Sequence, residues 1–331
     1  MSRSYVLRRT LYTLFVWLVV LALNFFIPQI GVDDPAARYY PPRLGSMTDQ
    51  QYEEIKQMTR EQYGFDKPIG TRFVIYIQHL LKGDMGNSFL PGRPKVADLI
   101  MERLPWTLVL SVTTMLISVI VGIIWGTFAA FRRGRSPDTL LLSASTLTTA
   151  MPAFFIALLL SMVVGFQLGW LPAYADPYMA TSFRWSLGSI ANVFRNASLP
   201  IISMCLGGIV GYALSTRNSV ISVSEEDFIV TAKAKGLSSR TVLYKHTLRN
   251  ATLPIVTRVG MSVSGLIGGA VVIEKIFNWN GMGTLFLEAN GNNDYPLMLG
   301  IMLLLSTIAL LANLVTDLTY GLLDPRVKAG E

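Results

Sequence analysis

The residue types that most often carry enzyme chemistry are scarce and scattered in this sequence of 331 residues. It has two histidines, His79 and His246, and one cysteine, Cys205. The topology inferred below puts the histidines on opposite faces of a membrane, so they cannot share a Ser-His site or a metal ion. No glycine is followed by lysine, which excludes the Gly-x-x-x-x-Gly-Lys loop that cradles nucleotide phosphates. We therefore expect no catalytic residue, metal site or cofactor in this chain, and Cys205 as a small core residue.

The composition is that of a membrane protein. Hydrophobic residues make up 51% of the chain and charged residues 15%, whereas a soluble domain has about 25% charged residues. A membrane-spanning helix needs about 20 residues. The third of the six apolar segments given next is longer than this, so it can tilt or kink at Pro152. We expect an all-α polytopic membrane protein, a single unit over residues 1–331, with six spans at 10–30, 105–131, 139–169, 197–217, 252–277 and 296–322.

The distribution of basic residues gives the orientation of a chain whose net charge is +7. With the N-terminus inside, the inner segments carry an excess of Lys and Arg, most clearly in the turn 131–136, and the outer segments are nearly balanced. Such an excess marks cytoplasmic loops. Both termini and the loop 218–251 are therefore expected in the cytoplasm. Nucleic-acid binding is excluded, because the basic residues flank apolar spans and no stacked aromatic surface accompanies them.

The outer side carries one sizeable segment, 31–103. Thr48 is placed to cap a helix through Gln51, and apolar residues continue at helical spacing to Tyr63. Gly and Pro residues over 64–68 break this helix, and a second amphipathic helix follows from Ile69. A third short element, 96–104, is expected to turn into the second span. The simplest role of this helical cap is to anchor the first two spans at the membrane surface.

The most unusual segment is polar and lies between two spans. Ser224 is a good N-cap for a helix with Asp227 in its first turn, and Gly236 fits the left-handed position that ends a helix. Ser238 or Ser239 then caps the next helix, and Pro254 fits the first turn of the following span. A folded, charged unit of this kind predicts a docking partner; the alternative is an ordinary loop.

Few ionisable residues lie within the spans. Glu274, Lys275 and Asp317 lie near span ends, where each is a functional candidate by default, although Glu274 and Lys275 could equally form an interfacial ion pair. Glycines at four-residue spacing allow close helix approach: Gly122/Gly126, Gly207/Gly211 and Gly265/Gly269. Hydroxyl groups in spans three to five either line a pathway or bond to carbonyls of their own helices: Thr148, Thr149, Ser161, Ser203, Ser262 and Ser264.

These motifs carry a family resemblance. Thr231-Ala232-x-x-x-Gly236 followed by Leu253-Pro254 resembles the EAA loop of binding-protein-dependent ABC importer permeases, and most of all the B-type subunit of the dipeptide/oligopeptide family. The likeness covers nearly the whole chain and departs from the family pattern at Leu214, Val230 and Asn280. It includes Gly83-Asp-Met-Gly-Asn-Ser-Phe89, Arg103-Leu-Pro105, Gly268-Gly-Ala-Val-Val-Ile-Glu274, Phe277-x-Trp279 and Leu323-Asp-Pro-Arg326.

The resemblance implies a non-catalytic permease subunit in a bacterial cytoplasmic membrane, forming half of a pathway for di- or oligopeptides. Its implied partners are a homologous second permease, two ATP-binding subunits that hold ATP and Mg, an extracytoplasmic substrate-binding protein that meets the outer cap, and membrane lipid. Oligosaccharides or nickel complexes are the alternative substrates, and a self-contained channel or secondary transporter is the rival class. The residues expected to couple to the ATPase subunits are Asp227, Thr231, Ala232, Gly236, Leu237, Ser238, Leu253 and Pro254. The residues expected to pack helices or to line the pathway are Pro152, Gly207, Gly211, Ser262, Gly265 and Gly269.

Overall fold

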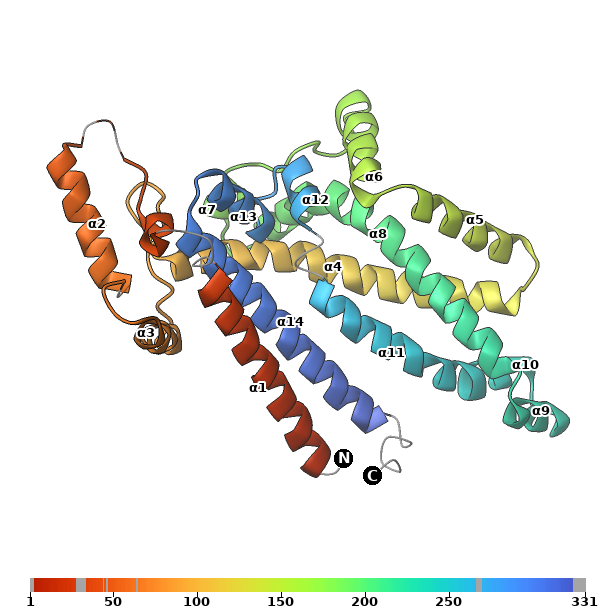
Figure 1. Ribbon diagram of the computed structural model, residues 1–331. Helices are drawn as coiled ribbons and strands as arrows, with labels where there is room; N and C mark the ends of the chain where they lie inside the picture. The colour runs from red at the N-terminus through yellow and green to blue at the C-terminus, as the bar shows by residue number, and fades with distance from the viewer. Residues whose placement is uncertain are drawn as a thin grey trace.

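The computed structural model describes residues 3–27, 34–43, 45, 47–63, 65–265 and 270–323, and these form helices and loops without a β-strand. Figure 1 shows long helices side by side, with a small helical cap at one end and a short helical projection at the other. The α-helices are α1 (Arg3–Phe26), α2 (Asp49–Tyr63), α3 (Ile69–Leu81), α4 (Val96–Phe131), α5 (Ser136–Ala150), α6 (Ala153–Leu160), α7 (Met179–Ser182), α8 (Leu187–Ser224), α9 (Asp227–Ala234), α10 (Ser239–Thr241), α11 (Leu248–Gly265), α12 (Val271–Ile276), α13 (Met282–Gly291) and α14 (Tyr295–Leu323). A 3₁₀ helix covers Pro35–Tyr39, and π-helical turns cover Ser161–Gln167 and Val242–Thr247.

Among the described helices, four are long and apolar enough to cross a membrane: Ser4–Phe26, Val96–Phe131, Leu187–Ser224 and Tyr295–Thr319. A fifth span results if Ser136–Ala150 and Ala153–Gln167 are taken together, although this pair is bent by 96°. The all-α polytopic fold is therefore confirmed. The expected span 252–277 coincides with α11 and α12, but residues 266–269 between them lie outside the described residues, so a total of six stays a prediction.

The bend in the third expected span lies at Pro152, as predicted. Met151 has an extended backbone (φ −110°, ψ 114°), and Pro152 precedes α6 with φ −60° and ψ 145°. The proline ring disfavours helical geometry in the residue before it. One helix therefore ends at Ala150, and a new one starts in another direction at Ala153.

The most extensive helix packing among the described residues joins α4 to α8. A Cβ atom at Gly122 would lie 2.5 Å from the Cβ of Tyr212, and one at Gly126 would lie 2.7 Å from the Cβ of Thr216. These distances are too short for real side chains, so only glycine allows the two backbones to come this close. The close approach expected from the Gly122/Gly126 spacing is thus present within the subunit. Gly207, in contrast, has no atom of a described residue within 4 Å of its would-be Cβ.

This difference predicts opposite effects of one methyl group. Gly126→Ala should destabilise the protein by about 1–3 kcal/mol, because the new Cβ overpacks the α4–α8 contact. Gly207→Ala should be neutral or stabilising, because the methyl group enters open space and alanine favours a helix. Thermal melting of the two variants in detergent measures this, and equal melting temperatures would contradict the packing of Gly126.

Helices α1 and α14 lie antiparallel, side by side (Figure 1). Hydrogen bonds along their length fix the register. Tyr5 Oη donates to the Asp317 carbonyl (3.2 Å) and Arg9 Nη1 to Asp317 Oδ2 (3.0 Å). Trp17 Nε1 donates to Thr307 Oγ1 (3.0 Å), and Asn24 Nδ2 to the Leu299 carbonyl (3.0 Å). The start of the first helix and the end of the last therefore lie on one side of the bundle. Asp317, a predicted functional candidate, is half exposed and serves this ion pair.

The helical cap formed by α2 and α3 follows its sequence signals. The Gln51 N–H donates to Thr48 Oγ1 (3.3 Å) and the Thr48 N–H to Gln51 Oε1 (3.0 Å), the predicted capping box at the start of α2. Helices α2 and α3 agree with the two predicted helices. The third element, 96–104, leads into the second span as predicted, because it is the first part of α4, which continues through Pro105 to Phe131.

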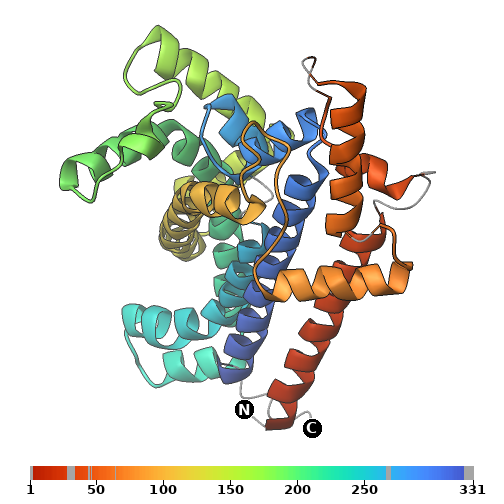
Figure 2. The ribbon, with the colours of Figure 1, turned by 90° about the vertical axis from the view of Figure 1, so that its left-hand side faces the viewer.

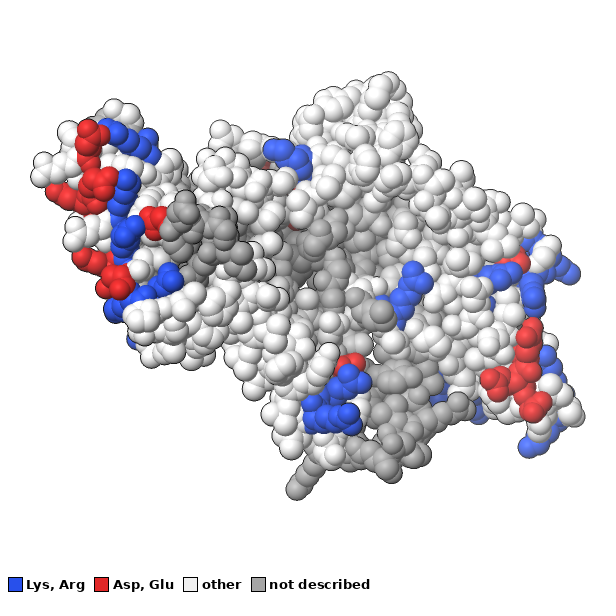
Figure 3. All heavy atoms as spheres, viewed as in Figure 1, with Lys and Arg blue, Asp and Glu red and all other residues white. Residues whose placement is uncertain are grey.

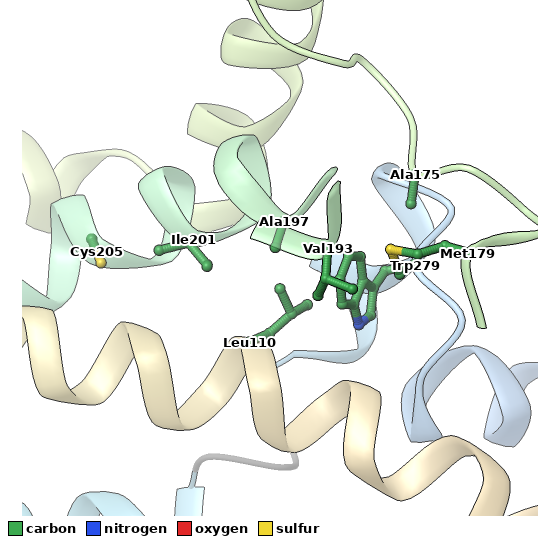
Figure 4. Close-up of a cluster of buried hydrophobic side chains, with 8 residues drawn as sticks. All are labelled: Leu110, Ala175, Met179, Val193, Ala197, Ile201, Cys205 and Trp279. Atoms are coloured by element: carbon green, nitrogen blue, oxygen red, sulfur yellow. The ribbon is translucent and has the colours of Figure 1, made fainter. Parts of the chain in front are cut away.

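A buried cluster joins α4, α8 and the loops before α8 and α13. Leu110, Val193 and Ile201 belong to one buried cluster with Trp279, whose Nε1–H donates to the Trp106 carbonyl (3.0 Å). Figure 4 shows the eight side chains of the cluster, with Cys205 at one end and Trp279, Met179 and Ala175 toward the other. Cys205 is 5% exposed, which confirms it as a core residue.

Candidate functional site

The polar segment 224–254 projects from the end of the bundle opposite the cap (Figure 1). Its predicted start was wrong: Ser224 does not cap α9. Helix α8 continues to Ser224, whose hydroxyl group donates to the Val220 carbonyl (2.6 Å). A serine that bonds to the carbonyl four residues earlier continues a helix, and its oxygen is directed away from the next one. Helix α9 instead begins at Asp227 after Glu226, without a side-chain cap.

The predicted end of α9 is confirmed. Gly236 has a left-handed backbone (φ +74°). Its N–H donates to the Lys233 carbonyl (2.9 Å), and the Leu237 N–H donates to the Ala232 carbonyl (3.4 Å). This pair of bonds is a Schellman motif, for which glycine at the left-handed position is the preferred residue. Ser238 caps the next helix as predicted, because its hydroxyl accepts from the Thr241 N–H (3.3 Å).

The position predicted for Pro254 was wrong. One helical run continues from α10 through the π-helical turn Val242–Thr247 into α11, and Pro254 lies inside α11. Because the helix runs without a break from Ser239 through the π-helical turn into α11, the span has no new first turn for the proline to occupy. Pro254 is exposed, and nothing is described of the Leu253 side chain.

The segment has a small core of its own. Ile229, Ala232 and Val242 are buried against one another and hold α9 to the helix that follows. The predicted coupling residues Asp227, Thr231 and Leu237 are exposed, and Thr231 Oγ1 donates to the Asp227 carbonyl (3.0 Å). Four large apolar side chains also face outward: Phe228 (43% exposed), Val230 (58%), Leu237 (39%) and Tyr244 (58%).

Charged groups gather around these apolar side chains. Figure 3 shows acidic and basic side chains together at this end of the molecule, while the central face is almost free of charge. A folded projection that combines exposed apolar residues with charges of both signs has the chemistry of a protein-docking surface.

Ion pairs attach this end of the molecule to α5 and to the turn before it. Arg217 Nε and Nη2 donate to the two carboxylate oxygens of Asp138 (2.6 and 3.0 Å), and the Gly134 N–H also donates to Asp138 (2.9 Å). Asp138 is 2% exposed. Arg133 and Glu225 form a second, exposed ion pair at 3.3 Å. In the sequence these arginines indicate only the orientation of the chain. No neighbouring residue predicts the carboxylates with which they pair.

The residues predicted to pack or to line a pathway are only partly brought together. A Cβ at Gly211 would meet the Arg258 guanidinium at 2.9 Å, and Ser262 Oγ accepts from Tyr212 Oη (2.8 Å) while donating to the Arg258 carbonyl (2.8 Å). These contacts join α8 to α11. The surroundings of Gly265, and Gly269 altogether, lie outside the described residues.

The predicted hydroxyl groups mostly serve their own helices. Thr148, Thr149 and Ser203 each donate to the carbonyl four residues earlier, at 3.0, 2.8 and 2.7 Å. Ser161 donates to Ala173 (3.4 Å), and nothing is described of the Ser264 side chain.

Glu274 does not form the interfacial pair with Lys275 that the sequence allowed. It is fully buried and accepts from Thr107 Oγ1 (2.6 Å) and from the N–H groups of Gly283 (2.7 Å) and Thr284 (3.2 Å). Thr107 Oγ1 in turn accepts from the Met282 N–H (2.7 Å). Glu274 therefore supplies from α12 the N-terminal cap that α13 lacks locally, and it joins α12, α13 and α4.

Asp294 performs a similar task where the outer loop meets α14, and sequence analysis missed it. Its Oδ1 accepts from the Leu297 N–H (3.1 Å), which caps α14. Its Oδ2 accepts from Ser88 Oγ (2.5 Å) and from the Phe89 N–H (2.7 Å). The Gly83-Asp-Met-Gly-Asn-Ser-Phe89 motif thus ends on a fully buried carboxylate. The only local signal is an Asp three residues before Leu297, at the start of a helix.

In the part of the chain that the structure describes, no three His, Cys, Asp or Glu residues cluster as metal ligands. Its buried carboxylates are used to cap helices or to bind an arginine, which leaves the exposed projection as the site to which a function is best assigned.

Comparison with known proteins agrees with this geometry. Residues 122–329 match the family described as "Binding-protein-dependent transport system inner membrane component". The chain is 30% identical to the oligopeptide transport system permease protein AppB of Bacillus subtilis, over 98% of this chain and 99% of that protein. It is 34% identical to the glutathione transport system permease protein GsiC of Salmonella typhimurium and 36% identical to the probable peptide ABC transporter permease protein y4tP of Sinorhizobium fredii, each over 98% of this chain and 99% of the relative. The chain belongs to the family of binding-protein-dependent transport system inner membrane components, as a multi-pass membrane protein.

Proposed function

We propose that the chain is the permease subunit that forms half of the substrate pathway in an ABC importer of di- or oligopeptides. It pairs with a homologous permease, two ATP-binding subunits and an extracytoplasmic substrate-binding protein. ATP and Mg belong to the ATP-binding subunits, and both termini of this chain lie in the cytoplasm. The substrate class is supported by relatives that are named as oligopeptide and peptide permeases and match this chain nearly end to end.

The observation that carries the coupling role is the folded projection 225–251. Its own buried core, its Schellman turn and its outward apolar side chains give it a defined shape that an ordinary loop would not need. An ATP-driven movement of a partner at α9 would reach the spans directly, because α10, the π-helical turn and α11 form one helical run. Such movement is transmitted as rigid-body rotation or sliding of packed helices.

Reconstitution tests the proposal. Three liposome preparations are compared. One contains the chain alone, one contains the complex of permeases with ATP-binding subunits, and one contains that complex with its binding protein. A radiolabelled tripeptide should accumulate only with the full set of proteins and hydrolysable ATP on the cytoplasmic side. A non-hydrolysable ATP analogue serves as the matched control.

Two outcomes would contradict the proposal at different levels. Tripeptide flux through the chain alone, without ATP, would favour a self-contained channel or secondary transporter. ATP-dependent uptake of an oligosaccharide or a nickel complex in place of the peptide would keep the importer and overturn the substrate class.

A further inference from the structure

A groove lies on the outer half of the molecule between α3, α1 and the start of α14. The free space inside it is about 80 Å³, and the groove is partly open to the surroundings. Most of its walls are apolar or aromatic, including Phe25, Ile75, Tyr76, Leu80, Leu299 and Leu303. Ligand-binding sites are typically mostly apolar hollows with a small number of polar groups.

Helix α3 crosses the spans at a steep angle. Figure 2 shows it lying across α1, and Figure 1 shows it nearly end-on while α1 runs in the plane of the view. The ring of Phe25 on α1 contacts the rings of Phe73 (5.2 Å) and Tyr76 (5.4 Å) on α3. Helix α3 also leaves Val74 53% exposed and Leu81 75% exposed. A short amphipathic helix that lies across the spans, anchored by aromatic rings, is typical of the membrane interface.

One cation in the groove has an unused hydrogen-bond donor. Arg72 Nε is buried and has no hydrogen-bond partner among the residues that the structure describes, while the guanidinium group lies 5.2 Å from the ring centroid of Phe65. Asp84, the one carboxylate among the residues described in the groove wall, is already engaged: one oxygen lies 2.8 Å from His79 Nδ1, and the other accepts from the Gly86 N–H (2.9 Å). Burial raises the pKa of Asp84, but these two bonds lower it further, so the carboxyl group stays charged and paired.

We propose that this groove binds one anionic phospholipid of the outer leaflet, with its phosphate on Arg72 and an acyl chain along the apolar walls. A buried donor without a partner is costly, and a guanidinium group matches the geometry of a phosphate oxygen pair. The groove faces the membrane interface, where such lipids are present at high local concentration. Bound there, the lipid would join the outer cap to α1 and α14. This inference does not depend on which solute is transported.

Native mass spectrometry of the complex in which the chain purifies tests the proposal. The complex is stripped of lipid with detergent and titrated with dioleoyl-phosphatidylglycerol or, separately, dioleoyl-phosphatidylcholine. Arg72→Gln should weaken the first phosphatidylglycerol binding event about tenfold, the loss expected for a charge-assisted hydrogen bond, and leave phosphatidylcholine binding unchanged. Ile75→Trp fills the groove and should weaken binding of both lipids.

Two matched variants control for charge and bulk. Lys67→Gln removes an exposed cation of the same cap, and Val74→Trp places the same bulk on the outward face of α3. Neither should change binding. Equal phosphatidylglycerol affinity in the parent, Arg72→Gln and Ile75→Trp would overturn the proposal. Displacement of the lipid by soluble glycerol phosphate at equal concentration would also overturn it, since it would make the site one for phosphate alone.

Discussion

Replacing Glu274 with alanine should strongly destabilise the region where α4, α12 and α13 meet. The change leaves the N–H groups of Gly283 and Thr284 and the hydroxyl of Thr107 without their buried acceptor. Each buried group left unsatisfied costs about 1–3 kcal/mol, so the three together should cost about 3 kcal/mol or more. Thermal unfolding of the purified protein in detergent should show a correspondingly lower melting temperature.

Two variants separate this capping role from a general effect of removing charge. Glu274→Gln keeps one carbonyl acceptor in a side chain of the same length and should fall between the parent and Glu274→Ala. Glu288→Ala removes a carboxylate from α13 itself, but that group is half exposed and lies 3.9 Å from Arg103, so its loss should have little effect. If Glu274→Ala had the same melting temperature as Glu288→Ala, capping of α13 by Glu274 would not stabilise the fold.

The features that the sequence predicts correctly are those governed by near neighbours in the chain. The capping box of Thr48 and Gln51, the bend at Pro152 and the left-handed Gly236 each depend on residues within about four positions. The glycine spacing on α4 is also correct, because a four-residue spacing places both glycines on one face of a helix.

The errors arise where a local signal competes with the continuation of a helix. Ser224 has the residue type of an N-cap, but its hydroxyl bonds backward because α8 has not yet ended. Pro254 has the residue type of a first turn, but a π-helical turn carries the helix past the expected break. Both choices depend on the packing of whole helices, which residue type alone does not determine.

The buried carboxylates show why the remaining features could not be predicted from sequence. Glu274 meets Thr107, Asp294 meets Ser88, and Asp138 meets Arg217, at separations of 167, 206 and 79 residues. A carboxylate can be buried only where such partners converge, and this convergence is set by the arrangement of α4, α8 and α14. The sequence marks Glu274 as unusual because it lies near a span, but the group that it binds appears only in the fold.

Replacing Gly236 with valine should abolish peptide-stimulated ATP hydrolysis by the assembled importer while leaving the chain inserted in the membrane. The left-handed backbone at Gly236 (φ +74°) is strained by roughly 1 kcal/mol or more for a β-branched residue. No atom lies within 4 Å of its would-be Cβ, so the effect cannot come from a clash inside the subunit. The valine instead displaces the turn after α9 and, with it, the exposed side chains Phe228, Val230 and Leu237. Hydrolysis measured with and without the loaded binding protein tests this.

Gly83 provides an internal control, because α3 ends in the same motif. Its backbone is also left-handed (φ +76°) with open space at its Cβ. The N–H groups of Gly83 and Asp84 donate to the carbonyls of Leu80 and His79, both at 2.9 Å. Gly83→Val therefore imposes the same strain on the outer cap and should leave the ATP-binding subunits attached on co-purification. Gly236→Asn, which tolerates a left-handed backbone, should largely restore stimulation. Full stimulation of ATP hydrolysis in Gly236→Val would indicate that the projection is only a connector between helices. A loss of attached subunits in both valine variants would show that strain in either turn disturbs the whole fold.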